Sequence, residues 1–313
     1  MNFYLKYNFE YRPIFDVLEN KKKINFFIDL QSICTGFYNR DVVLMEVGRY
    51  VSDGKISDIL LSEYRSYLLN LYNRFKKYDP YFITFFDDGA CLQNRSLNTE
   101  YKNKNSIDNM QVEVENIQLF RTIKKYYFQK IFEQYNKKPD VTKAFYLKEY
   151  EADCIPHYCL QENLFDSRES DVVNVMLSKD KDLLQTCKFE NTYQAVSGYK
   201  SSKGGHYSRL FNNQDCIEYI YPNFKRGILT AKHIPLILSM MGDKADVING
   251  IDKVGPARAV KIIQDYNVPI NIDGLKNAKT LPQIVIDNFD LIVSNLKIVD
   301  FDEQLKRVPM EKF

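Results

Sequence analysis

Short runs of hydrophobic residues recur along the chain and are separated by polar segments. Four of them, at residues 24–30, 81–86, 142–147 and 172–177, are too short for an ordinary helix and contain many β-branched or aromatic residues. Each therefore predicts a strand that is covered on both faces. Between the first two runs, hydrophobic residues recur at helical spacing across residues 56–75. A strand, a helix and a second strand in this order predict a parallel, right-handed β-α-β unit, and hence an α/β fold with a mainly parallel central sheet flanked by helices.

The second half of the chain predicts further strands and helices. A polar stretch with several glycines at residues 189–214 predicts a strand followed by a hairpin or loop, and residues 234–241 predict a helix that Gly242 ends. Pro256 fits the first position of another helix. We therefore expect three regions: an N-terminal extension at 1–23, a core at 24–228 with a long insertion at about 89–140, and a helical subdomain at 229–313.

Carboxylate side chains end or follow each of the four predicted strands. Asp29 lies near the end of the first strand, and the later acids are Asp87 and Asp88, Glu151 and Asp153, and Asp180 and Asp182. In a parallel sheet these four ends lie on one edge, which is where open α/β sheets bind ligands. Carboxylates so close together repel one another unless a positive charge lies between them, so the pattern predicts a divalent-cation site.

The last acidic pair has a second interpretation. Asp180 could cap a helix that begins near Lys181, with Asp182 as a solvated acid in its first turn. Taken alone, the two carboxylates fit this reading as well as they fit a metal site. The acids at the other three strand ends favour the metal.

The insertion at 89–140 is long, charged and aromatic. Between Arg95 and Lys138 it has nine basic and five acidic residues, interleaved with tyrosine and phenylalanine. Basic residues can follow a phosphate backbone and aromatic rings can stack on bases, so one interpretation is a nucleic-acid-binding segment. A solvated amphipathic helix that packs on the domain fits the segment equally well.

Two helices joined by a glycine-containing turn are predicted across residues 242–263. Gly250 and Gly255 permit tight turns, and the amides at the start of the second helix could bind a phosphate oxygen without reading any base. A structural helix-turn-helix without a ligand is the alternative.

Composition narrows the function classes without deciding between them. The chain has 313 residues, 45% of them hydrophobic, and a net charge of +2, which fits a soluble globular protein and does not exclude nucleic acid. Its six cysteines form no C-x-x-C pair and have no zinc-ligand spacing with the three histidines, so reduced thiols are expected. No apolar run approaches the roughly 18 residues of a membrane span, and the N-terminus has no apolar signal core. We expect a cytoplasmic protein with no membrane partner.

Six short motifs occur in order along residues 24–263. They are F-F-I-D-L, F-F-D-D-G, R-S-L-N-T-E-Y-K, Y-E-A-D, S-K-D-K-D-L-L-Q, and G-D-K-A-D followed by G-I-D-K-V-G-P-A-R-A. In this order they resemble the metal-dependent 5′ nucleases. That family includes flap endonucleases, the 5′-nuclease domain of bacterial DNA polymerase I, and bacteriophage 5′ to 3′ exonucleases and RNase H, of which the phage enzymes are nearest in type. The resemblance implies a PIN-like core, a helical arch or clamp at 89–140 and a helix-three-turn-helix subdomain.

The resemblance also implies roles for individual residues. The first divalent ion would be held by Asp29, Asp87, Glu151 and Asp153, and the second by Asp180, Asp182 and Asp246 with the additional acid Asp243. Lys102 and Arg95 would lie over the scissile phosphate. Nucleic-acid contacts would come from Lys104, Arg121, Lys124, Lys125, Gly250, Lys253, Gly255 and Arg258. In several family members the helix-three-turn-helix also holds a potassium ion.

Three positions depart from the family pattern. Cys154 stands where the bacterial and phage enzymes often have another acid, and Val247 and Asn249 replace the Asn and Pro of the polymerase-associated type. Asp87 and Asp88 are adjacent, and side chains alternate along a strand, so only one of them should face the metals. The family position favours Asp87.

The expected function is a Mg²⁺-dependent 5′ to 3′ exonuclease and flap endonuclease with two metal ions, which Mn²⁺ can replace. Its substrates would be DNA with 5′ flaps, nicks or ends, and RNA–DNA hybrids, as in primer removal during replication. We expect a monomer, with replication proteins as candidate partners. Two alternatives stay open: a non-catalytic, structure-selective DNA-binding protein, and a PIN-type endoribonuclease. The first has no need of acids at four strand ends, and the second has no need of residues 242–263.

Overall fold

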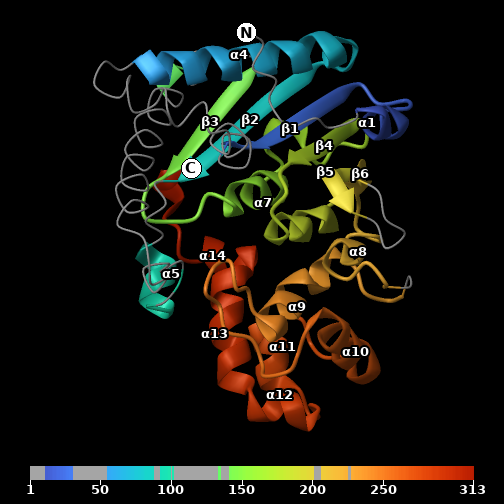
Figure 1. The fold of residues 1–313 in the computed structure, drawn as a ribbon, viewed down its shortest axis with the longest axis vertical. Coiled ribbons are helices and arrows are strands. Elements are labelled where there is room, and N and C mark those ends of the chain that lie inside the picture. The colour runs from blue at the N-terminus through green and yellow to red at the C-terminus, as the bar shows by residue number, and fades with distance from the viewer. Residues whose placement is uncertain are drawn as a thin grey trace.

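The computed structural model describes residues 11–30, 55–87, 92–99, 101, 133–134, 141–200, 206–224 and 227–313. Within these residues, strands form one sheet in the order β3-β2-β1-β4-β5-β6 (Figure 1). Their bounds are β1 Lys23–Asp29, β2 Pro80–Asp87, β3 Thr142–Leu147, β4 Val172–Leu177, β5 Thr192–Lys200 and β6 His206–Phe211. Neighbouring strands from β3 to β5 pair in parallel, and β6 pairs with β5 as an antiparallel hairpin. The predicted mainly parallel sheet is confirmed.

The register of the parallel strands sets their carboxyl ends side by side. Asp29 of β1 lies opposite Phe85 of β2, and Asp87 of β2 lies opposite Leu147 of β3. β4 ends at Leu177, which lies opposite the residue before Asp29. Four strand ends that carry or precede acids thus share one edge of the sheet.

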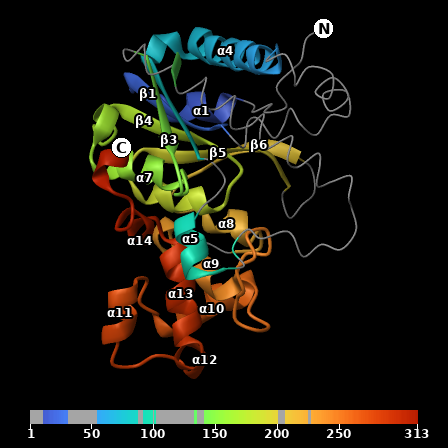
Figure 2. The ribbon, with the colours of Figure 1, turned by 90° about the vertical axis from the view of Figure 1, so that its left-hand side faces the viewer.

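Successive residues of a strand point to opposite faces of the sheet, so these strands present hydrophobic side chains on both faces. Helices cover both. On one face, α1 (Arg12–Val17) and α4 (Lys55–Phe75) belong to the cluster that contains Phe26 of β1. On the other face, α7 (Cys154–Gln161) belongs to the cluster that contains the next residue, Phe27. Figures 1 and 2 show α4 and α7 on opposite sides of the strands. The sheet is therefore buried on both faces, as its hydrophobic runs predict.

The described part of the predicted N-terminal extension packs into this core. Pro13 stands in the first turn of α1, where its missing N–H has no helical partner to lose. Ile14 and Leu18 are buried against the sheet. Burial of each such side chain contributes about 1.5–3 kcal/mol. Residues 11–23 therefore help to stabilise the core.

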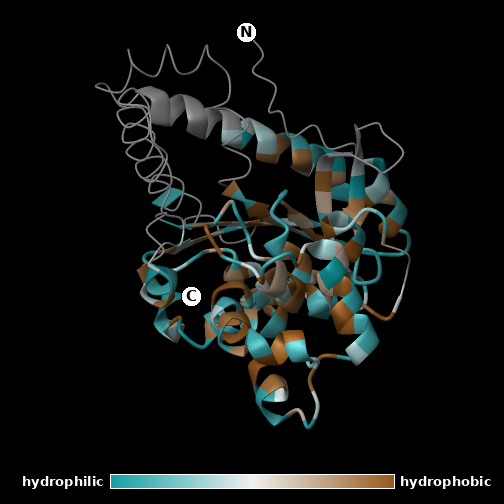
Figure 3. Cartoon of the chain, turned by 60° about the horizontal axis from the view of Figure 1, so that its bottom comes forward, coloured by the Kyte–Doolittle hydropathy of each residue, from teal (hydrophilic) through white to brown (hydrophobic). Residues whose placement is uncertain are grey.

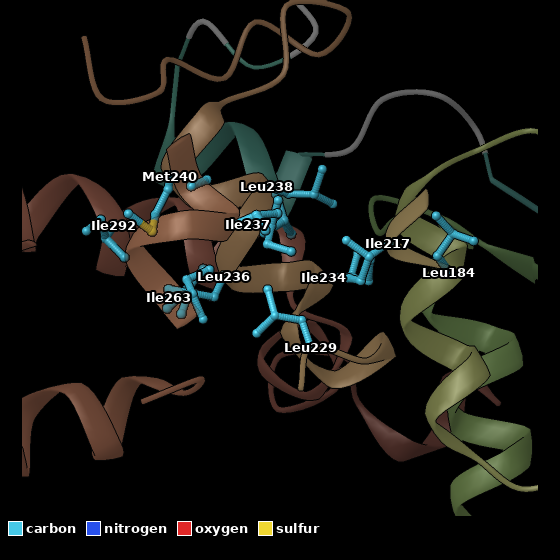
Figure 4. Packing of buried hydrophobic residues seen from close by; sticks show 14 of the residues in the cluster. Leu184, Ile217, Leu229, Ile234, Leu236, Ile237, Leu238, Met240, Ile263 and Ile292 are labelled. Carbon is cyan, nitrogen blue, oxygen red and sulfur yellow. The ribbon is translucent and has the colours of Figure 1, made fainter. Parts of the chain in front are cut away.

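Short helices form the C-terminal part of the molecule. With α8 (Ile217–Ile220) before them, they are α9 (Ile234–Met241), α10 (Pro256–Tyr266), α11 (Ile272–Asn277), α12 (Gln283–Asp287), α13 (Phe289–Val299) and α14 (Phe301–Leu305). α9 ends at Gly242, as predicted. Leu236 and Met240 of α9 share a buried cluster with Ile263 of α10 and Ile292 of α13 (Figure 4). Figure 3 shows hydrophobic and hydrophilic residues mixed in this part of the molecule, whereas residues 234–240 of α9 are all buried.

A polar cluster ties α14 to the core. His157 Nε2 on α7 donates to Asp302 Oδ1 over 2.8 Å, and Lys188 Nζ lies 2.7 Å from Asp302 Oδ2. Burial lowers the pKa of His157, so this histidine is a neutral donor at neutral pH. The hydrogen bond from His157 holds the pKa of Asp302 well below its usual range. Burial opposes this shift, and the charge of Lys188 adds to it.

None of the helices in the described part of the chain is both long and apolar enough to cross a membrane.

Candidate functional site

Asp29, at the end of β1, is held by the residue that follows β4. Ser178 Oγ donates to Asp29 Oδ2 over 2.7 Å, and the same hydroxyl accepts from Asp180 N over 3.0 Å. Asp29 and Ser178 are both buried. Ser178 was missed by the sequence reasoning, and its only signal is its place directly after a buried strand. One serine thus connects Asp29 to the segment that carries the Asp180–Asp182 pair.

Glu151 and Asp87 are also fixed by specific donors. Tyr101 Oη donates to Glu151 Oε1 over 2.5 Å, and Asn94 Nδ2 donates to Glu151 Oε2 over 2.8 Å. Asp87 Oδ2 accepts from the backbone amide of Ala152 over 3.1 Å. All of these residues are buried. The orientations of both carboxylates are therefore set before any ligand arrives.

Asn94 is held in turn from the C-terminal end of the chain. Arg307 Nη2 donates to Asn94 Oδ1 over 2.9 Å and to Lys297 O over 2.6 Å. Burial lowers the pKa of Arg307, although the charge of Glu151 opposes this shift. The contact places α5 (Leu92–Leu97), the start of the predicted arch, beside α13 (Figure 1). Arg307, Asn94 and Glu151 thus form a chain of contacts from the C-terminal helices to the sheet edge.

Asp180 and Asp182 follow β4 and differ in environment. Asp180 Oδ1 accepts from Asp182 N over 3.0 Å at the first residue of the 3₁₀ helix Asp182–Lys188, but the N-cap residue of that helix is Lys181. Asp182 is not the solvated acid of that alternative. Its Oδ1 is buried and has no hydrogen-bond partner among the described residues. Burial, and then the charges of Asp180 and Asp246, raise the pKa of Asp182 well above its usual range.

Asp243 meets these acids from the loop after α9. Lys181 Nζ lies 2.5 Å from Asp243 Oδ2, and Ala245 N donates to Asp243 Oδ1 over 2.9 Å. The backbones of Asp243 and Ile248 form a two-bond bridge of 2.9 and 2.8 Å, which closes the loop that contains Asp246. Asp243 and Asp246 lie close enough to Asp182 for their charges to raise its pKa.

The first acidic group consists of Asp29, Asp87, Glu151 and Asp153, and the second consists of Asp180, Asp182, Asp243 and Asp246. The chemistry of both groups fits a divalent cation. Among the described residues, no three His, Cys, Asp or Glu side chains converge closely enough to hold an ion in this conformation. The buried Oδ1 of Asp182 nevertheless lacks a donor, and the carboxylates around it disfavour one another's charge. Carboxylate oxygens are the ligands that Mg²⁺ and Ca²⁺ prefer. A cation at Asp182 would supply the charge that this oxygen lacks.

Cys154 stands where the resemblance would place another acid, but it does not take over that acid's role as a metal ligand. Its side chain is fully buried, and its Sγ donates to Glu151 O over 3.2 Å. Burial, followed by the charges of Asp153 and Glu151, raises the pKa of this thiol well above its usual range. A neutral thiol is a poor metal ligand. The described cysteines Cys154, Cys159, Cys187 and Cys216 are all free and buried, as predicted.

The turn between α9 and α10 contains glycines of two kinds. A Cβ on Gly250 would lie 2.3 Å from the carbonyl carbon of Met241, so the close approach of two backbone segments requires glycine there. A Cβ on Gly255 would meet nothing within 4 Å, and its φ of −94° suits any residue. Gly255 precedes Pro256, the first residue of α10, and Lys253 is exposed beside it. Pro256 has no N–H, and Arg258 N and Ala259 N already donate to Gly255 O, so Ala257 N, on an exposed residue, is the first-turn amide that a ligand could use.

Known proteins resemble this chain in fold. No protein-family model matches the sequence, and no curated protein matches it. The fold, however, matches a crystal structure of bacteriophage T5 D15 protein co-crystallised with metal ions, with a TM-score of 0.63 at 16% identity over 93% of this chain and 95% of that chain. T5 5′-exonuclease with bound zinc gives 0.62 at 17% identity over 93% and 95%. A complex of T5 D15 flap endonuclease with DNA and metal ions gives 0.59 at 15% identity over 89% of each chain.

The chain has a 5′-nuclease fold. The predicted fold class is confirmed, and at the level of the fold so is the resemblance stated from the six motifs. Within this 5′-nuclease fold, the second acidic group is brought together around Asp182, and the acids Asp29, Asp87 and Glu151 lie at the same sheet edge, each with its own donor. Asp153 is half-buried directly before α7.

The basic residues of the 5′-nuclease fold are described only in part. Arg95 lies on α5 and is half-buried, and its Nε has no hydrogen-bond partner among the described residues. Arg258 is exposed on α10. Most of the predicted arch at 89–140 lies outside the described residues, together with Asp88, Lys102, Lys104, Arg121, Lys124 and Lys125.

Proposed function

We propose that this protein is a divalent-metal-dependent 5′ nuclease that hydrolyses phosphodiester bonds in DNA and in RNA–DNA hybrids. The observation that carries the proposal is the buried, unpartnered Oδ1 of Asp182 beside the charges of Asp180 and Asp246. A protein that only binds nucleic acid has no use for carboxylates that destabilise one another. A divalent cation stabilises such a group, and a metal-dependent nuclease needs one there.

Two Mg²⁺ ions fit the donor set, and Mn²⁺ would substitute for them. One position would be held by Asp29, Asp87, Glu151 and Asp153, and the other by Asp180, Asp182 and Asp246 with Asp243. When bound, the ions would lower the pKa of a water molecule and stabilise charge on the leaving oxygen of the phosphodiester.

The chain's own contribution is to hold these carboxylates in place. Ser178 fixes Asp29, and Asn94 and Tyr101 fix both oxygens of Glu151. Because each donor comes from a different element, the geometry of the site depends on the whole sheet edge. Held ligands need no rearrangement during the reaction, which is how preorganised sites accelerate it.

Nucleic acid would be bound through its backbone. The exposed start of α10, where Ala257 N could donate, suits a phosphate oxygen, and Lys253 and Arg258 are exposed beside it. A potassium ion at this turn, and phosphate contacts from Lys102 and Arg95, are proposals that rest on the family resemblance. The T5 flap endonuclease complex with DNA supports DNA as the substrate class. The α9–α10 turn also favours this function over a PIN-type endoribonuclease, which would not need it.

The test is a panel of labelled substrates incubated with and without Mg²⁺. It contains a 5′-flap DNA, a nicked duplex, a blunt duplex, a single strand and an RNA–DNA hybrid. We expect Mg²⁺-dependent release of 5′ fragments from the flap, the nick and the hybrid, and little cleavage of the single strand. No cleavage of any member with Mg²⁺ or Mn²⁺ would refute the proposal, and cleavage confined to single-stranded RNA would favour the endoribonuclease.

A further inference from the structure

A lysine side chain lies within the second acidic group. Lys181 stands between Asp180 and Asp182 in the sequence, and its Nζ lies 2.5 Å from Asp243 Oδ2. The exposed fractions of the two side chains are 28% for Lys181 and 11% for Asp243, so water screens this ion pair only in part.

The ion pair takes up the remaining oxygen of Asp243. Ala245 N already donates to Oδ1, so Oδ2 is the atom that Lys181 and a metal ion would share. Burial lowers the pKa of Lys181, but the bond to Asp243 and the charges of Asp182 and Asp180 outweigh this effect and raise it. Lys181 in turn favours the charged form of Asp182, although burial and the neighbouring acids dominate there. Its ammonium group thus partly neutralises the carboxylates that we assign to the second ion.

We propose that Lys181 is a resident counter-ion of the second carboxylate group, and that it weakens divalent-cation binding there by competing for Asp243. The inference rests on the proposed metal-dependent function. Without the divalent ion, Lys181 keeps Asp243 paired and the loop that contains Asp246 in place. When the ion binds, the ammonium group has to leave Asp243 or remain beside a second positive charge, and either outcome opposes binding.

The variant Lys181→Met removes the charge and keeps most of the aliphatic side chain. Lys179→Met is the matched control, because Lys179 is exposed, lies two residues away and removes the same formal charge. The backbone carbonyl of Lys179 accepts from Tyr219 Oη over 2.7 Å, a contact that does not depend on the lysine side chain. Lys181→Arg keeps the charge and tests whether charge alone is responsible.

The measurement is direct Mn²⁺ binding by calorimetry and by the loss of the free-ion electron paramagnetic resonance signal, without nucleic acid. Of the two Mn²⁺ ions, we expect Lys181→Met to bind the more weakly held one about tenfold more tightly than the wild type does. The reason is that the variant lacks a unit positive charge a few ångströms from the ion, which would repel it. Lys179→Met and Lys181→Arg should stay within about twofold of the wild type. Lys181→Met should also lose thermal stability without metal, because Asp243 is left unpaired, and regain it with Mn²⁺.

Equal affinities of Lys181→Met and Lys179→Met for Mn²⁺ would overturn the inference. Weaker binding by Lys181→Met would overturn it too, because Lys181 would then support the ion. Asp182→Asn separates this failure from failure of the proposed function. If Asp182→Asn binds Mn²⁺ like the wild type, the second metal position itself is wrong, whatever Lys181 does.

Discussion

The two glycines of the α9–α10 turn lead to opposite predictions, and together they test the proposed binding of duplex DNA at this turn. Gly250→Ala places a methyl group 2.3 Å from the backbone of Met241, which cannot move without displacing α9. We expect a loss of about 3 kcal/mol or more in the free energy of unfolding, the upper range for overpacking. At Gly255 the methyl group meets nothing within 4 Å and the backbone is already in an ordinary conformation.

The expected stability change for Gly255→Ala is small. Alanine reduces the freedom of the unfolded chain, which stabilises a protein by about 0.4–1 kcal/mol. It is a poorer N-cap residue than glycine, which offsets a similar amount. The methyl group nevertheless stands beside the first amides of α10, where a phosphate oxygen would approach. Loss of one hydrogen bond to a charged group costs about 1.5 kcal/mol or more, which is a tenfold or greater loss of affinity.

Stability is measured by thermal melting, and affinity by fluorescence anisotropy with duplex and single-stranded DNA without divalent ions. Gly255→Ala should melt within a few degrees of the wild type and bind duplex at least about tenfold more weakly, with a smaller loss on single strands. Gly255→Ser is a second variant with the same Cβ and a better capping side chain. Wild-type duplex affinity in both Gly255 variants would refute backbone binding at this turn. Unchanged melting of Gly250→Ala would refute the close approach of the two segments.

Three further predictions concern other parts of the molecule. Val247 has a φ of 59°, a left-handed conformation that β-branched residues avoid, so Val247→Asn should raise the free energy of unfolding by about 1 kcal/mol; a lower melting temperature would contradict this. Asp302→Asn should lower the melting temperature at pH 7. The difference from the wild type should shrink as the pH falls below about 4, because a depressed pKa stabilises the fold only while the unfolded aspartate would be charged; a constant difference would refute the reasoning. Asn94→Ala removes a donor from buried Glu151 and should cost about 2 kcal/mol and weaken Mn²⁺ binding; calorimetry showing wild-type affinity would argue against a positioning role.

The strands and the acidic edge could be predicted from the sequence because both depend on local pattern. A strand buried on both faces is a short continuous hydrophobic run, and β3 and β4 have the predicted bounds. β1 begins and ends one residue earlier than predicted, and β2 extends to include Asp87. Strand ends in a parallel sheet meet at one edge whatever their side chains. The acids at those ends therefore predict the candidate site.

The donors that hold the acids could not be predicted, because their partners are distant in sequence and their residue types are common. Arg307 reaches Asn94 across 213 residues, and Ser178 reaches Asp29 across 149. In the capping alternative, Asp180 does accept a hydrogen bond near the helix start, but Lys181 is the N-cap residue and Asp182 is not a solvated acid. Only the packing around the sheet edge covers the Oδ1 of Asp182, and a two-residue spacing carries no information about burial.

The central claim is that the carboxylates at this sheet edge hold the metal that cleaves the phosphodiester bond. Single-turnover cleavage of a 5′-flap DNA, measured against Mg²⁺ concentration for the wild type and Asp182→Asn, tests it most directly. We expect wild-type cleavage to rise with Mg²⁺ and to stop on chelation. We expect Asp182→Asn to be slower by about a hundredfold or more, with flap affinity within a few-fold of the wild type. Full cleavage by Asp182→Asn at every Mg²⁺ concentration would contradict the claim.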